Sequence, residues 1–323
     1  MSEQTTATRR TVLKTTGAAI AAAAVPATAA AADEGWTGVE SPTGNTLHDV
    51  ERVRGEAADQ VSADAFAVGG SGVVLKRTSN SWRTQLDGGP SGNGNDLYGS
   101  DMTDDGKRLW FVGASGAIGE YDIRSGSLEN RSAPMDVTNN FNDVAVTGEA
   151  GDASVYVAGD SGKMYHSFEN GEEGSWDDVT PGSGSNVNAV GFFGGREGHI
   201  VDGNKTVFGT DDGSTWGKIG IEDANENFYG VDSDGSDDVW VCGGGGIIHH
   251  WNGSEWTPAD TGDAALRDIE VEGGDGWTVG GGEVYQYDGT WTQTETPTGQ
   301  NLNAVVRGDP GIAVGAGGTI IER

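Results

Sequence analysis

The amino-acid sequence predicts an all-β protein, a seven-bladed β-propeller of four-stranded antiparallel blades. Three observations lead to this prediction. Glycine supplies 56 of the 323 residues, far above its usual share, and it closes many short segments. Beyond residue 32, apolar residues come in short runs without the spacing of an amphipathic helix. A short phrase also recurs seven times, at intervals of 36 to 50 residues, which indicates radial repetition.

The recurring phrase marks the start of each unit. It places an apolar anchor at the beginning of the unit's first strand, often beside an asparagine and usually followed by Val or Ile. The anchors are 50, 44, 46, 41, 38 and 36 residues apart. They are Leu47, Leu97, Phe141, Val187, Phe228, Leu266 and Leu302.

The rest of each unit predicts three further strands. The second apolar run ends in a glycine-containing turn, such as VGGSG at 68, VGASG at 112 or VGAGG at 314. Glycine in these turns supplies the positive φ that tight hairpins need. A tryptophan then opens the fourth strand in five units, where we expect it to pack between neighbouring blades. These residues are Trp82, Trp176, Trp216, Trp256 and Trp291, with Leu128 in the second unit.

A repeated phrase explains how the ring closes. Residues 36–44 read WTGVESPTG, and residues 291–299 read WTQTETPTG. The seventh unit stops after its third strand, TIIER, and has no fourth strand of its own. We therefore expect the segment after Trp36 to pair with TIIER, so that no blade keeps an open edge. Residues 33–323 are predicted to form this one domain.

Residues 1–32 are predicted to be a targeting segment rather than part of the fold. Arg9 and Arg10 precede a small-residue apolar stretch, and Ala-x-Ala cleavage options follow. The sequence TRRTVLK resembles a twin-arginine export signal, with Thr8 and Val12 at positions that more often hold Ser and Phe. This resemblance implies an extracellular or cell-surface protein with no stable membrane insertion after cleavage. The alternative is an uncleaved membrane anchor.

The net charge of the chain indicates the salt environment in which it works and excludes some classes of partner. Residues 1–32 carry three basic side chains and one acidic one, so the formal charge of −31 becomes −33 without them. Such an acidic, lysine-poor chain resembles exported proteins of halophilic archaea, whose self-repulsion is screened by salt. Nucleic acid and anionic membrane surfaces are poor partners for it. The single cysteine, Cys242, cannot form an intramolecular disulfide and is expected to be buried.

One turn carries a family motif. The sequence GTDDGSTW at 209–216 resembles the Asp-box of BNR repeats, with Gly209 in place of the usual serine. The matching positions are Asp211, Gly213, Thr215 and Trp216. A degenerate copy occupies residues 167–176. Residues 35–323 are similar to Asp-box/YVTN/BNR-like β-propellers, a group that includes photosystem II assembly factors and sialidases.

Two classes of function remain open. The first is an exported, monomeric, non-catalytic binding or scaffolding propeller that recognises a protein or glycan partner. The alternative is a secreted sialidase-type glycan hydrolase, which by resemblance needs three converging arginines, a Tyr/Glu nucleophile pair and an acid/base Asp. We assign no catalytic residue, although Arg52, Arg267, Tyr98 and Tyr229 lie near the first strands. No cofactor is expected.

Two further kinds of site follow from short motifs. The stretch DSDGSDD at 232–238 has the acidic density of a Ca²⁺ loop, but it lacks EF-hand spacing and also suits a plain Asp-Gly turn. Its candidate metal ligands are Asp232, Asp234 and Asp237. Three Asn-x-Ser/Thr sequons lie in predicted turns and are candidate glycosylation sites. They are Asn130, Asn204 and Asn252.

Overall fold

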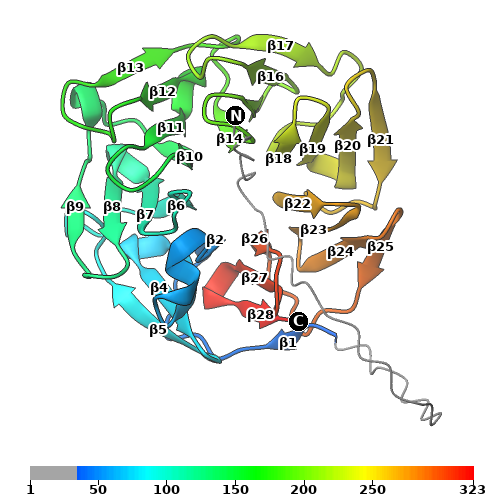
Figure 1. The fold of residues 1–323 in the computed structure, drawn as a ribbon. Helices are drawn as coiled ribbons and strands as arrows, with labels where there is room; N and C mark the ends of the chain where they lie inside the picture. Colours follow the sequence, from blue (N-terminus) through cyan, green and yellow to red (C-terminus); the bar gives the residue numbers. More distant parts are fainter. Residues whose placement is uncertain (1–34) are drawn as a thin grey trace, which may run out of the picture.

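A computed structural model describes residues 35–323 and folds them into a ring of seven four-stranded antiparallel sheets (Figure 1). The seven-bladed propeller predicted from the repeats is thereby confirmed. The targeting signal predicted at residues 1–32 lies outside the described residues. No helix in residues 35–323 is long and apolar enough to span a bilayer.

The first and second strands of each blade form its inner half. The first strands surround the centre of the ring (Figure 1); they are β2 (Leu47–Arg52), β6 (Leu97–Met102), β10 (Phe141–Thr147), β14 (Val187–Phe192), β18 (Phe228–Gly235), β22 (Asp268–Glu272) and β26 (Leu302–Val306). The second strands are β3 (Ala63–Gly69), β7 (Arg108–Gly113), β11 (Ser154–Gly159), β15 (Gly198–Asp202), β19 (Asp238–Gly243), β23 (Asp275–Gly280) and β27 (Ile312–Gly315). Six predicted anchors open their strands, and Leu266 lies two residues before β22.

The third and fourth strands form the outer half. The third strands are β4 (Val74–Thr78), β8 (Ile118–Asp122), β12 (Met164–Ser167), β16 (Val207–Thr210), β20 (Ile247–Trp251), β24 (Glu283–Tyr287) and β28 (Ile320–Glu322). The fourth strands are β5 (Ser81–Leu86), β9 (Leu128–Asn130), β13 (Trp176–Val179), β17 (Gly217–Gly220), β21 (Trp256–Asp260), β25 (Trp291–Thr294) and β1 (Thr37–Gly38). Short 3-10 turns connect some strands: η1 (Gly55–Asp59), η2 (Gly70–Gly72), η3 (Ala114–Gly116), η4 (Pro134–Asp136), η5 (Asp160–Gly162), η6 (Gly244–Gly246) and η7 (Ala316–Gly318).

The two ends of the described chain close the ring, as predicted. Strand β1 pairs antiparallel with β28, with Thr37 opposite Glu322. The amide of Val39 extends the pairing by donating to the carbonyl of Ile320 at 3.0 Å. The last blade therefore has the order β1-β28-β27-β26, and its outer strand comes from the other end of the chain.

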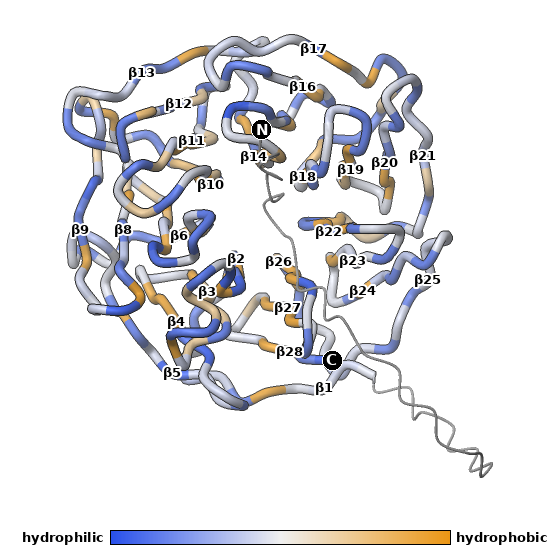
Figure 2. The backbone as a smooth tube through the Cα atoms, viewed as in Figure 1, coloured by the Kyte–Doolittle hydropathy of each residue, from blue (hydrophilic) through white to orange (hydrophobic). Residues whose placement is uncertain are grey.

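The apolar core lies between the blades. Hydrophobic residues follow the strands, whereas the connecting loops are mainly hydrophilic (Figure 2). Each fourth-strand tryptophan belongs to the cluster shared by its own blade and the preceding one, which confirms the packing role predicted for it. Trp82, for example, is 6% exposed and packs with residues of the first and last blades. Leu128 takes the corresponding place between the first and second blades.

The glycine-rich turns join each blade to the next. In the first blade, Ser71 has φ +59°, and its amide donates to Oδ1 of Asp96 in the second blade at 2.7 Å. Gly72 has φ +73°, and a Cβ there would lie 2.3 Å from the amide nitrogen of Gly89. The loop that follows β5 approaches Gly72 closely because the amide of Gly89 donates a hydrogen bond to the carbonyl of Gly72. Glycine is thus required both by the backbone conformation and by the approach of the loop.

Candidate functional site: the central channel

The first strands of all seven blades line a narrow central channel. Its cavity volume is about 120 Å³, and its walls are mostly polar. Ligand pockets for drug-sized molecules usually enclose roughly 300–1,000 Å³. The channel therefore has room for a few water molecules or one inserted side chain, and larger partners can meet it only at its openings.

A belt of side chains surrounds the end of the channel where the first strands begin, which we call the channel mouth. Each blade contributes the residue that follows its apolar anchor: His48, Tyr98, Asn142, Asn188, Tyr229, Arg267 and Asn303. The three asparagines connect neighbouring blades, because each Nδ2 donates to the carbonyl of the next blade's anchor. The bonds measure 2.9 Å for Asn142, 2.6 Å for Asn188 and 2.8 Å for Asn303.

The remaining members of the belt form two pairs. His48 and Tyr98 meet edge to face, with ring centroids 5.3 Å apart. The guanidinium carbon of Arg267 lies 4.5 Å from the ring centroid of Tyr229. Arg267 is exposed, whereas the other three are half-buried. Burial raises the pKa of the Tyr98 hydroxyl, with smaller contributions from the charges of Asp96 and Asp160. Tyr98 is thus a neutral hydroxyl over the physiological range.

Deeper in the channel, carboxylates connect the blades through backbone hydrogen bonds. On three first strands an aspartate directly follows the belt residue, and one oxygen accepts an amide hydrogen from the next blade. The N···O distances are 2.6 Å from Ser100 to Asp49, 2.8 Å from Val190 to Asp143 and 2.9 Å from Val305 to Asp268. A second set of carboxylates lies two residues further along the first strands, and each also accepts an amide hydrogen from the next blade. The N···O distances are 2.6 Å from Val146 to Asp101, from Val271 to Asp232 and from Arg307 to Glu270.

Small residues make room for these carboxylates. A Cβ on Gly99 would lie 2.7 Å from both Cα and Oδ1 of Asp143 in the next blade. A Cβ on Gly230 would lie 3.0 Å from Cα of Asp268. The position after the belt residue is Asp in three blades and Gly or Ala in the other four. Every blade with Gly or Ala there neighbours a blade with Asp, so the small residue leaves space for the neighbouring carboxylate.

The channel is electrostatically crowded. The pKa of Asp49 is raised well above its usual value, first by burial and then by the charges of Glu51, Asp143 and Asp268. The hydrogen bond from Ser100 opposes this shift only in part. Six carboxylates along the channel hold backbone amides of the ring, so the structure engages them as fixed acceptors.

Arginines do not converge on the channel mouth. Arg267 lies where the first strands begin, whereas Arg52 is the last residue of β2 and Arg54 lies just beyond it, at the opposite side of the ring. The side chain of Arg52 donates to the carbonyls of Arg307 and Pro310, and Arg54 pairs with Asp101 at 2.9 Å. The three converging arginines implied by the sialidase resemblance are therefore not brought together at the mouth by the described residues.

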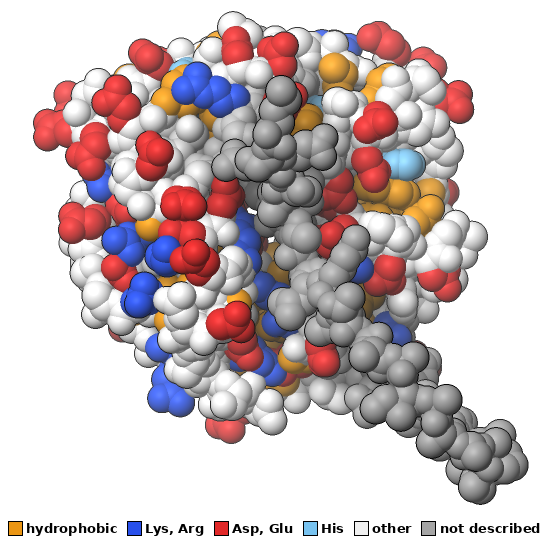
Figure 3. Space-filling model, in the orientation of Figure 1, with side chains coloured by type: hydrophobic (Ala, Val, Ile, Leu, Met, Phe, Trp, Pro, Cys, Tyr) orange, Lys and Arg blue, Asp and Glu red, His pale blue; other side chains and the backbone are white. Residues whose placement is uncertain are grey.

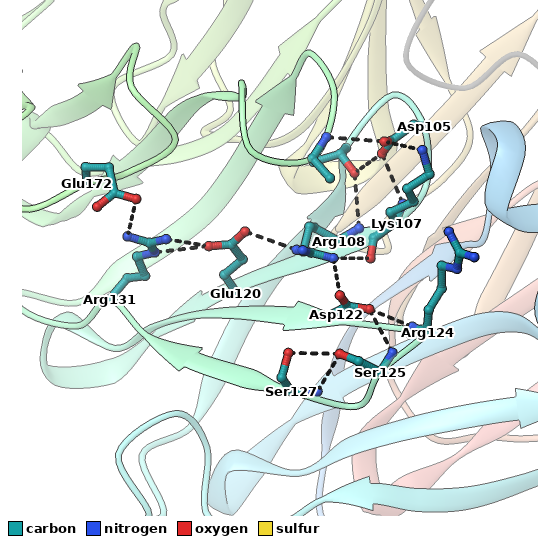
Figure 4. Close-up of polar contacts among 12 residues, drawn as sticks. Asp105, Lys107, Arg108, Glu120, Asp122, Arg124, Ser125, Ser127, Arg131 and Glu172 are labelled. Carbon is teal, nitrogen blue, oxygen red and sulfur yellow. Dashed lines mark hydrogen bonds and ion pairs between the residues drawn. The ribbon is translucent and has the colours of Figure 1, made fainter.

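The opposite face carries the first-to-second and third-to-fourth strand turns, and we call it the turn face. In Figure 3 basic side chains lie among acidic ones, mainly over the first and second blades. Many of them belong to ion-pair networks around the second blade (Figure 4). Arg131 contacts Glu120 at 2.8 Å and Glu172 at 3.3 Å, while Arg108 reaches Glu120 and Asp122. These networks neutralise the cations locally.

The candidate calcium residues do not gather into one group. Asp232 lies in the channel wall and accepts the amide of Val271. Asp237 is exposed in the turn between β18 and β19, and Asp234 lines the channel. Within residues 35–323, no three His, Cys, Asp or Glu side chains are arranged to hold a metal ion. The adjacent histidines contact different carboxylates, His249 with Glu226 and His250 with Asp238.

The Asp-box-like segment forms the turn between β16 and β17. The carboxylate of Asp212 accepts the amides of Ser214 at 2.7 Å and Thr215 at 2.6 Å, and the hydroxyl of Thr210 accepts the amide of Gly213 at 2.9 Å. The contacts from Thr215, followed by those from Ser214, lower the pKa of Asp212. Asp211, which the motif aligns with the family aspartate, is exposed. Gly213 has φ +73° and lies against Tyr156, and Trp216 is half-buried among residues of the third and fourth blades.

The three sequon asparagines are all exposed. Asn130 ends β9, Asn204 lies between β15 and β16, and Asn252 lies between β20 and β21. From the sequence, Tyr98, Tyr229 and Arg267 were named as residues near the first strands and Asp232 as a candidate metal ligand, whereas the belt as a whole was not predicted. The signal was present in the residues next to each anchor, where Asn, Tyr, His and Arg alternate with Asp, Gly and Ala along the seven repeats.

Comparisons with known proteins identify the fold but no family. A scan against protein-family models gives no match, and neither does a comparison with curated proteins. Among solved structures, YCF48 from Cyanidioschyzon merolae has a TM-score of 0.68 at 16% identity, covering 89% of this chain and 98% of that one. The structure of YCF48 bound to D1 peptide has a TM-score of 0.69 at 14% sequence identity, and the match covers 90% of this chain and 94% of that one.

An enzyme has the same architecture. Virginiamycin B lyase from Staphylococcus aureus, in a catalytically inactive form with quinupristin, has a TM-score of 0.73 at 11% identity. The match covers 89% of this chain and 98% of the lyase. Such low identities establish the architecture alone. The chain is similar in fold to a β-propeller solved with a bound peptide and to one that is a lyase.

Proposed function

We propose that this protein is an exported, non-catalytic binding propeller that recognises a protein partner through the channel mouth. The observation that supports this most strongly is the belt: two tyrosines, a histidine and an arginine face the opening, each held by a ring contact within the belt. Tyrosine and arginine are enriched at the energetic centres of protein interfaces. Side chains already held in place lose less conformational entropy on binding.

The channel favours binding over catalysis. Six carboxylates along it accept amides of neighbouring blades, and the cavity of about 120 Å³ is too small for a sugar ring with its catalytic groups. The structural neighbour solved with a bound peptide shows that the same architecture can hold such a ligand. The alternative, a sialidase-type hydrolase, lacks a converging arginine triad at the mouth among the described residues.

A photocrosslinking experiment tests the proposal. A benzoylphenylalanine replaces Tyr98 in one sample and the exposed Thr84 on the outer strand β5 in a control. In extracellular extract of the native host at molar salt, we expect a discrete crosslinked protein from position 98 only. The Arg267→Ala substitution should weaken that crosslink. Equal crosslinking from both positions would contradict a binding role for the mouth.

Two assays address the remaining parts of the proposal. Hydrolysis of a fluorogenic sialoside that disappears with Arg267→Ala would establish the hydrolase instead. Export is part of the proposal because Arg9 and Arg10 begin a twin-arginine-like segment. Replacing both arginines by lysine should retain the protein inside the cell, and unchanged secretion would contradict that route.

A further inference from the structure

A second surface, on the turn face, contains an arginine whose guanidinium lies over an aromatic ring. Arg196 lies in the turn between β14 and β15, and its guanidinium carbon is 3.7 Å from the ring centroid of Phe168 in the preceding blade. Arg196 is exposed, and Phe168 is half-buried. In Figure 3 a basic group lies beside hydrophobic side chains over β12 and β14. A planar guanidinium stacked in this way keeps its edge donors available.

The turn that carries Arg196 is fixed to the neighbouring blade. The carbonyl of Gly195 accepts hydrogen bonds from the hydroxyls of Thr147 at 2.8 Å and Tyr156 at 2.9 Å. The ring of Tyr156 also stacks on Phe192, at the end of β14, with centroids 3.8 Å apart. The position of the guanidinium is thus set by the framework of two blades rather than by a mobile loop.

Arg196 differs in its charge environment from the described arginines that form ion pairs. Arg77, Arg108, Arg131 and Arg307 each contact a carboxylate, whereas Arg196 forms no ion pair with a described residue. Beneath Phe168, the ring of His166 lies 4.9 Å away and is 8% exposed, and its Nδ1 has no hydrogen-bond partner within the described residues. Burial lowers the pKa of His166, so this ring is neutral near pH 7 and Arg196 supplies the charge.

We propose that the Arg196–Phe168 pair binds a carboxylate of an acidic peptide segment on the turn face. Two nitrogen atoms of a guanidinium match the two oxygens of a carboxylate, and an arginine immobilised beforehand loses little freedom on binding. The stacked rings disfavour a sugar ligand. One face of Phe168 is covered by Arg196, and Phe193 stacks on His199 with centroids 5.7 Å apart. This site is separate from the channel mouth and does not depend on the function proposed for it.

NMR of the arginine Nε–H groups gives a direct test. The full chain in molar salt is titrated with a glutamate-rich hexapeptide, with the matching glutamine peptide and with an oligogalacturonate. We expect the Arg196 resonance to shift with the glutamate peptide alone. Arg196→Ala should weaken its binding at least tenfold, and Arg196→Lys should recover only part of the loss, since lysine lacks the planar fork.

The matched control is Arg124→Ala, which removes another exposed arginine of the turn face that contacts no aromatic ring of residues 35–323. It should leave peptide binding unchanged. Because Arg196 is exposed, its alanine variant should keep the wild-type melting temperature, which separates lost binding from lost folding. Unchanged peptide binding by Arg196→Ala, or equal binding of the glutamine peptide, would overturn the proposal. Binding of the oligogalacturonate in place of the glutamate peptide would overturn the peptide assignment.

Discussion

Arg77 on β4 and Glu322 on β28 form a buried ion pair that joins the first blade to the last strand of the chain. Nε and Nη2 of Arg77 each lie 2.8 Å from a different carboxylate oxygen of Glu322. Trp82 donates its indole N–H to the same carboxylate at 2.9 Å. Arg77 is 2% exposed and Glu322 9% exposed. Since Thr37 pairs with Glu322 through the backbone, the ion pair and the strand closure reinforce each other.

Removing one member of this pair should destabilise the ring strongly. Glu322→Gln removes the bidentate partner of the buried Arg77 guanidinium and leaves Asp64 as its remaining carboxylate contact, so we expect a loss of about 1–3 kcal/mol in the free energy of unfolding. Chemical denaturation at neutral pH measures the loss. A surface control is Asp178→Asn, which breaks the exposed pair with Lys163. A loss no larger than that of the control would contradict the role of the pair.

The same pair predicts a pH dependence. Burial alone would raise the pKa of Glu322, but the hydrogen bonds from Arg77 and Trp82 outweigh it and lower the pKa. A carboxyl with a lowered pKa in the folded state stabilises the protein above its unfolded pKa, and this contribution disappears as the pH falls through the folded value. Stability should therefore fall below about pH 4. The difference between wild type and Glu322→Gln should shrink over the same range, and a constant difference would contradict the assignment.

Deleting residues 35–44 should open the ring. The deletion removes β1 and the buried ring of Trp36, so the backbone of β28 loses its outer partner. We expect the melting temperature to fall by on the order of 10 °C, with aggregation during heating. Calorimetry and light scattering measure both effects. Wild-type melting by the truncated chain would show that the terminal strand does not close the ring.

The fit of small residues against carboxylates predicts a sharp steric effect at Gly99. An added methyl group would meet the backbone and carboxylate of Asp143 at 2.7 Å, so Gly99→Ala should cost about 1–3 kcal/mol of unfolding free energy. The matched control is Gly217→Ala in β17, where an added Cβ has no neighbour within 4 Å. Equal stabilities for the two variants would disprove this steric account of the inner ring.

Salt should stabilise the fold. The formal charge of −33 without residues 1–32 implies strong self-repulsion, which salt screens over about 3 Å at 1 M and only over about 30 Å at 0.01 M. We expect the melting temperature to fall steadily as salt is reduced from molar to millimolar concentration. An uncharged osmolyte tests whether the effect is electrostatic, because it cannot screen charge. A melting temperature that does not vary with salt would refute the prediction.

The exposed sequons predict modification in an exporting host. Oδ1 of Asn252 accepts the amides of Ser254 and Glu255, both at 3.0 Å, and the residue stays exposed in its turn. We expect Asn252 to carry a glycan on protein secreted by its native host. Intact-mass measurement of wild type and Asn252→Gln would show the added mass and its loss. An unmodified mass in the secreted wild type would exclude glycosylation at all three sites.

The sequence by itself determined the number of blades, the closing strand and the inter-blade tryptophans. These features depend on local chemistry that repeats along the chain: an apolar anchor, a glycine-rich turn and a large ring at the fourth strand. Because the pattern occurs seven times, it predicts the fold even where one copy differs, as in the second unit, which has Leu128 in place of tryptophan. The duplicated phrase beginning at Trp36 was sufficient to predict the pairing of β1 with β28.

Only the tertiary structure decided which side chains meet across blades. Arg77 and Glu322 are 245 positions apart, and the contacts of Arg196 with Phe168 and of Asp143 with Gly99 also cross a blade boundary. Such contacts depend on side-chain direction and on the rotation between neighbouring sheets, which a single repeat does not encode. Even within one turn, the motif aligned Asp211, whereas the backbone path placed the carboxylate of Asp212 over the amides of Ser214 and Thr215.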